Sequence, residues 1–132
     1  MYRGAHFAIV TEVGPEVLAG SSRMKAGTGQ KMVLNALSTG AMARLGYVYG
    51  NLMVNLHLLN QKLAERGVTI LQSAADLDRE QARQTLKAAG NDVPIALGML
   101  KAGVPRAQAA RSLNTTAGHV RKAIALAQRS KP

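Results

Sequence analysis

The sequence has no cysteine and no tryptophan, and its only aromatic residues are one phenylalanine and three tyrosines. Without cysteine there can be no disulfide, no thiolate metal site and no cysteine nucleophile, which suits a reducing compartment. Because 47% of the residues are nonetheless apolar, the core must be built from aliphatic side chains. An aliphatic core favours packed helices over a β-sandwich.

Long apolar runs are also missing. No stretch approaches the roughly 18 apolar residues of a membrane-spanning helix. The residues that follow Met1 lead into only a short apolar run, which lacks the pattern of a signal peptide. We therefore expect a cytoplasmic protein whose 132 residues make one domain, or a small domain with an appendage.

Acidic residues are absent from the last 40 positions. All seven carboxylates lie at or before Asp92, and seven units of the net charge of +10 come from the residues beyond it. These basic residues are Lys101, Arg106, Arg111, Arg121, Lys122, Arg129 and Lys131. Such asymmetry suggests an anionic partner, such as nucleic acid, an acidic protein surface or a phosphorylated ligand. The alternative is a set of solvated helix faces with no partner.

The three histidines do not form a metal-binding pattern. His6, His57 and His119 are far apart in the sequence and show no H-E-x-x-H or similar spacing. We expect no metal site and no cofactor.

Residues 7–13 are apolar and β-branched, and Gly14-Pro15 ends the run. This pattern predicts one short strand that is buried on both faces. The rest of the chain offers little to pair with such a strand. Because an unpaired edge recruits another chain, we expect a homo-oligomer, a dimer or higher.

A helical period begins near Gln30, and Gly40 predicts a break at residues 38–40. Residues 52–54 are expected to form a short extended piece, followed by a helix over residues 60–74. That helix should bury Leu63, Val68 and Leu71.

The last third of the chain predicts a small helical bundle with short turns. Asp78 should cap a helix that ends at Gly90, and Asp92 with Pro94 should start a helix that ends near Gly103. Pro105 should open a third helix, which is followed by a turn at Leu113-Asn114. Thr116 should cap a fourth helix that reaches about Gln128.

A glycine-rich loop between the expected strand and the first helix has the residues of a phosphate site. Ser21 and Ser22 offer hydroxyls, Arg23 a planar fork of donors and Lys25 a point charge, while the helix start offers free N–H groups. Glu16 is an acceptor suited to sugar hydroxyls. Neither G-x-x-x-x-G-K-[S/T] nor G-x-G-x-x-G is present. The alternative is a capped helix start with solvated cations.

The run GPEVLAGSSRMKAGTGQKMVLN (residues 14–35) resembles the signature of the glucokinase regulatory protein family. The longer stretch to LSTGAMARLGYVYGNLMVNL is similar to its bacterial members, the N-acetylmuramic acid 6-phosphate etherases. The similarity continues more weakly through the C-terminal helices. Ser22 stands where threonine is common in the family, Gly29 where alanine is common, and Asn55 where an acid is common.

The resemblance implies a mainly α chain. Residues 1–74 would be the C-terminal remnant of a sugar isomerase (SIS) type α/β domain with one or two short strands, and residues 75–132 a small ubiquitin-associated-like helical domain. It also implies that Glu16, Ser21, Ser22, Arg23 and Lys25 line or support a phosphosugar pocket.

The activity implied is that of a carbon–oxygen lyase, which cleaves the D-lactyl ether of N-acetylmuramic acid 6-phosphate during peptidoglycan recycling. Ether elimination needs a carboxylate base and an acid, and the family places its catalytic glutamates in an N-terminal part that this chain lacks. We therefore assign no catalytic residue and expect the chain alone to be inactive, so that its standing as an enzyme is open.

A second hypothesis concerns the C-terminus. Five residues there have the offsets of a helix-turn-helix: Ala110, Leu113, Asn114, Thr116 and Val120. Arg121 and Lys122 would then lie on the second helix, where they would contact DNA phosphates. In this alternative the chain is a small basic interaction module with a vestigial sugar loop. The same spacing fits two ordinary packed helices.

Overall fold

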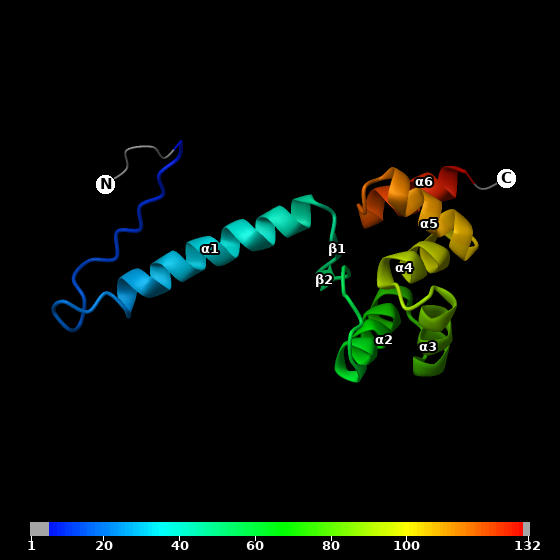
Figure 1. Cartoon of the computed structure of the whole chain (residues 1–132), viewed down its shortest axis with the longest axis horizontal. Helices are drawn as coiled ribbons and strands as arrows, with labels where there is room; N and C mark the ends of the chain where they lie inside the picture. The colour runs from blue at the N-terminus through cyan, green and yellow to red at the C-terminus, as the bar shows by residue number, and fades with distance from the viewer. Residues whose placement is uncertain (1–5, 131–132) are drawn as a thin grey trace. The chain divides into compact units, whose positions relative to one another are not determined.

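The computed structural model describes residues 6–130, and in that range it contains six helices and one two-stranded hairpin (Figure 1). The elements are α1 (Lys25–Arg44), β1 (Val48–Tyr49), β2 (Leu52–Met53), α2 (Gln61–Ala75), α3 (Arg79–Ala88), α4 (Val93–Ala102), α5 (Arg106–Thr115) and α6 (Val120–Arg129). The predicted mainly α class is confirmed. The chain divides into two compact units, Met1–Ala41 and Met42–Pro132. Most of the segment considered as a signal peptide, and Lys131, lie outside the described residues.

The strand predicted over residues 7–13 is wrong. The segment is extended, but it pairs with no other part of the described chain. The side chains of Phe7, Ile9 and Val10 are 92%, 60% and 61% exposed. The β-branched composition favours extended backbone, but a strand also needs a neighbour to receive its hydrogen bonds.

Helix α1 is longer than predicted. It begins at Lys25 and continues without a break to Arg44, so the predicted break near Gly40 is wrong. One interior glycine costs about 1 kcal/mol relative to alanine, which a 20-residue helix tolerates. None of the residues of α1 is buried.

A hairpin follows α1. The antiparallel strands β1 and β2 pair Val48 with Met53 and Tyr49 with Leu52. The extended piece expected at residues 52–54 is therefore present, whereas its partner β1 was not predicted. Two-residue strands are too short to show the alternation by which a strand is recognised in a sequence.

Helices α2 and α3 begin as predicted. Asn60 caps α2 by accepting a hydrogen bond from the Leu63 N–H at 2.9 Å. Val68 and Leu71 are buried, while Leu63 is half-buried. Asp78 starts α3 with a capping box, in which its side chain bonds the backbone of Gln81 and the Gln81 side chain returns the bond.

Helix α4 also begins and ends as predicted, at the Asp92 cap and at Gly103 with φ +63°. The turn predicted at Leu113-Asn114 is wrong, because α5 continues to Thr115. Thr116 does not cap α6 either. Its hydroxyl donates back to the Ser112 carbonyl at 2.9 Å, and this bond prolongs the end of α5. The turn occupies residues 116–119.

The core lies in the second unit and is aliphatic. Its largest fully buried side chains are Leu71, Leu97, Val54, Val93 and Val120. Helix α2 packs on α3 and α4, and α4 packs on α5 and α6 (Figure 1). The division expected between residues 74 and 75 stays a prediction about family domains, although α2 packs with the helices that follow it. No helix in the described range combines the length and the apolar character needed to cross a membrane.

Candidate functional site

The glycine-rich loop folds back onto the start of α1 through Glu16. Its carboxylate accepts hydrogen bonds from the Lys25 N–H, at 3.2 Å to Oε1 and 3.0 Å to Oε2, and from the Ala26 N–H at 3.0 Å. The first turn of a helix leaves such N–H groups without partners, and its positive end favours an anion. Glu16 thus supplies from within the chain the negative charge that we expected a ligand to bring.

Lys25 closes the same loop from the other side. Its ammonium donates to the Pro15 carbonyl at 2.8 Å, which uses one of its three N–H donors. Within the loop, the Ser21 N–H donates to the Leu18 carbonyl at 3.1 Å and the Gly27 N–H to the Ser22 carbonyl at 2.8 Å. Glu16 and Lys25 therefore fix both ends of a compact loop.

Ser21, Ser22 and Arg23 lie between these two fixed points. Ser21 is half-buried, and Ser22 and Arg23 are exposed. The bonds of Ser21 and Ser22 within the described residues are made by their backbone N–H and carbonyl groups, respectively. Their hydroxyls and the Arg23 guanidinium are therefore left for solvent or a ligand. Four of the five predicted site residues thus lie in the loop, and Lys25 is the first residue of α1.

Gly29 permits a close approach between the extended segment and α1. A Cβ atom at this position would lie 3.2 Å from both Thr11 Oγ1 and Val13 Cγ1, which is tighter than most real contacts. The alanine that is common here in the family would press on this segment. In the sequence the glycine stood out only as a departure from the alanine that is common in the family, since its role depends on a neighbour 16 residues away.

The described residues contain no group of three or more histidines and carboxylates that is placed to hold a metal ion. His119, considered in the sequence only as a metal ligand, lies next to Gly46, where an added Cβ would be 2.3 Å from the ring Cγ. Its Nδ1 atom is buried and has no hydrogen-bond partner among the described residues. Nothing in the sequence pattern indicated this packing.

Among the cavities of the described residues, three lie in the second unit, and none of these three is lined by the five predicted site residues. One lies between α5 and α6, one beside His119 and Arg121, and an apolar one beside the hairpin. Arg121 and Lys122 are exposed in the first turn of α6. DNA binding by this region stays a prediction.

No model of a known protein family matches the chain. The chain is 52% identical over 117 residues to N-acetylmuramic acid 6-phosphate etherase 2 of Bacillus licheniformis. It is 48% identical over 120 residues to the N-acetylmuramic acid 6-phosphate etherase of Klebsiella aerogenes, and 45% identical over 124 residues to that of Clostridium botulinum.

These alignments cover 89%, 91% and 94% of the chain, but only 39%, 40% and 41% of the respective relatives. The chain therefore spans about two fifths of the length of the curated relatives it matches. The resemblance found in the sequence is confirmed: over about nine tenths of its length the chain is homologous to N-acetylmuramic acid 6-phosphate etherases, of which it corresponds to a portion.

Proposed function

We propose that the chain is the phosphosugar-binding, C-terminal portion of an N-acetylmuramic acid 6-phosphate etherase-like protein of peptidoglycan recycling. The carrying observation is the ordered motif loop, whose ends are held by Glu16 and Lys25. The relatives named as etherases, at 45% to 52% identity, support the same function.

The five motif residues divide into two roles in this proposal. Glu16 and Lys25 support the loop, because their charged groups already bond its backbone. Ser21, Ser22 and Arg23 bind the phosphate, through two hydroxyls and a guanidinium that can bond two oxygens at once. Since the Glu16 carboxylate occupies the start of α1, side chains rather than the helix dipole hold the ligand.

The exposed apolar surface of the first unit supports the idea that this portion is one part of a larger fold. Helix α1 has no buried residue, and Ile9 and Val10 are more than half exposed. An apolar surface of this kind marks an interaction site. We propose that this apolar surface packs against the part of the etherase fold that the chain does not span, and that residues 75–132 form the ubiquitin-associated-like domain.

Catalysis is assigned to that other part. Ether elimination requires a carboxylate free to remove a proton. The Glu16 carboxylate bonds two backbone N–H groups, and Glu12 lies exposed on the extended segment. We propose that neither is the base and that the chain alone does not cleave the ether.

Calorimetric titration of the chain with N-acetylmuramic acid 6-phosphate and N-acetylglucosamine 6-phosphate tests the proposal. We expect saturable binding that is lost in Ser21→Ala and Arg23→Gln and kept in the control Arg44→Gln, which removes the same charge from the exposed far end of α1. Absence of any sugar response, together with salt-dependent duplex DNA binding that is lost in Arg121→Ala and Lys122→Ala, would favour the DNA-binding hypothesis instead.

A further inference from the structure

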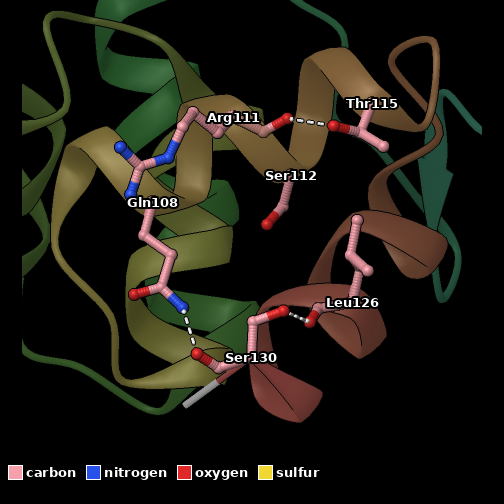
Figure 2. Close-up of a pocket in the computed structure, with 6 residues that line it drawn as sticks. All are labelled: Gln108, Arg111, Ser112, Thr115, Leu126 and Ser130. Atoms are coloured by element: carbon pink, nitrogen blue, oxygen red, sulfur yellow. Dashed lines mark hydrogen bonds between the residues drawn. The ribbon is translucent and has the colours of Figure 1, made fainter. Parts of the chain in front are cut away.

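A polar groove lies between α5 and α6 (Figure 2). The α5–α6 groove has a volume of about 320 Å³, within the usual range of roughly 300 to 1,000 Å³ for small-molecule pockets. It is lined by Gln108, Arg111, Ser112, Thr115, Leu126 and Ser130. Five of these six side chains are polar. All six residues belong to the second unit, and none of them is part of the motif loop.

Among the described residues, Ser112 is the one polar residue that is buried, with only 6% of its surface exposed. Figure 2 shows its side chain directed into the groove, and no described residue bonds the hydroxyl. Serine and threonine in helices usually donate to the carbonyl four residues earlier. Thr115 does so to Arg111 at 2.9 Å and Ser130 to Leu126 at 3.0 Å. Ser112 departs from its neighbours, and its hydroxyl is available to a molecule in the groove.

Arg111 brings an unbalanced positive charge to the edge of the same groove, where Figure 2 shows its guanidinium beside Gln108. The ion pairs of the described residues join Glu65 to Arg79 and Arg83, and no acidic residue follows Asp92 in the sequence. The Arg111 guanidinium therefore has no carboxylate partner within residues 93–130. A guanidinium with free donors is suited to bond two oxygens of a carboxylate or phosphate.

Gln108 lies on α5, as Arg111 and Ser112 do, and it connects this wall of the groove to α6. Its side-chain amide donates to the Ser130 carbonyl at 3.2 Å and to the Ala127 carbonyl at 3.4 Å, which ties the start of α5 to the end of α6 (Figure 2). These carbonyls are thereby occupied and present less negative charge to an incoming anion. Leu126 adds an apolar contact at the other end.

We propose that the α5–α6 groove binds the oxyanion of a small organic molecule, a carboxylate or a phosphate monoester, with Arg111 as its counter-charge and the Ser112 hydroxyl as a hydrogen-bond donor. The free lone pairs of the Thr115 and Ser130 hydroxyls accept hydrogen bonds from the rest of the ligand. This site is separate from the motif loop, so it stands or falls independently of the function proposed above.

Amide-resolved NMR titrations of the whole chain test the site, with sodium phosphate and sodium acetate as probes at constant ionic strength. We expect saturable shifts centred on residues 108–115 and 126–130. A response to phosphate alone identifies a phosphate site, and a response to acetate alone a carboxylate site. Linear, unsaturated shifts spread over the basic residues of all helices, or no shifts with either probe, would overturn the proposal.

Three variants connect the response to the two named groups. Arg111→Gln should weaken binding about tenfold, the effect of losing one charge-assisted interaction. Ser112→Ala should weaken it about threefold, since one neutral hydrogen bond is lost. The control Arg121→Gln removes the same charge from an exposed residue of α6 that does not line the groove, and it should leave binding unchanged. Equal weakening in Arg111→Gln and Arg121→Gln would refute a specific site, provided that circular dichroism shows the helices intact.

Discussion

Replacing Glu16 by alanine removes the carboxylate that holds three hydrogen-bond contacts on the first turn of α1. Loss of a side-chain cap lowers the stability of a helix by about 0.5 to 2 kcal/mol. Loss of a negative charge at the helix start lowers it by about 0.3 to 1 kcal/mol. Because α1 has no buried residue, tertiary packing does not compensate for this loss. We therefore expect a local destabilisation of about 1 to 2 kcal/mol, or roughly a 5- to 30-fold change in the opening equilibrium.

Amide hydrogen exchange measures this change directly. Protection of the Lys25 and Ala26 amides should fall about 5- to 30-fold in Glu16→Ala, and less in Glu16→Gln, which keeps an acceptor oxygen without the charge. Amides of α2 to α6 should be unaffected. Glu12→Gln is the matched control, because Glu12 is exposed and the bonds at the start of α1 come from Glu16. Unchanged protection at Lys25 and Ala26 in Glu16→Ala would refute the capping role.

Four further predictions follow from the same structure. Gly46→Ala should lower the free energy of unfolding by more than about 1 kcal/mol, because a methyl group collides with His119 and φ is +87°; an unchanged urea midpoint contradicts this. Gly40→Ala, with no atom within 4 Å, should stabilise α1 by about 1 kcal/mol, seen as slower amide exchange. Asp78→Ala should cost about 1 kcal/mol in urea unfolding through the lost capping box. Light scattering should find a dimer or larger species, and a monomer at all concentrations would disprove it.

Helix boundaries were predictable where they depend on neighbouring residues. Asn60, Asp78 and Asp92 each bond a backbone N–H three residues later, so the whole interaction is contained in a few letters of sequence. The same local chemistry misled at Thr116, because a threonine can cap the following helix or bond back to the preceding one. Only the arrangement of the two helices decides between these outcomes.

Features that join distant residues could not be predicted in the same way. The motif loop was found because its residues are consecutive, but its internal anion was missed, since Glu16 reaches an N–H nine residues away. The strand predicted at residues 7–13 failed for a related reason. A β-strand is a property of two segments, and none of the described residues pairs with this one.

The contact between Gly46 and α6 has a consequence for how the second unit folds. The Val120 N–H donates to the Gly46 carbonyl at 3.2 Å, and Val54 and Val120 belong to the same hydrophobic cluster. More than 70 residues separate Gly46 from Val120, so this pairing closes a long loop. The entropic cost of closing the loop is offset only when α6 has packed against this part of the chain. During synthesis the segment around the hairpin emerges from the ribosome well before α6. The bond between Gly46 and Val120 therefore forms only after α6 has been translated.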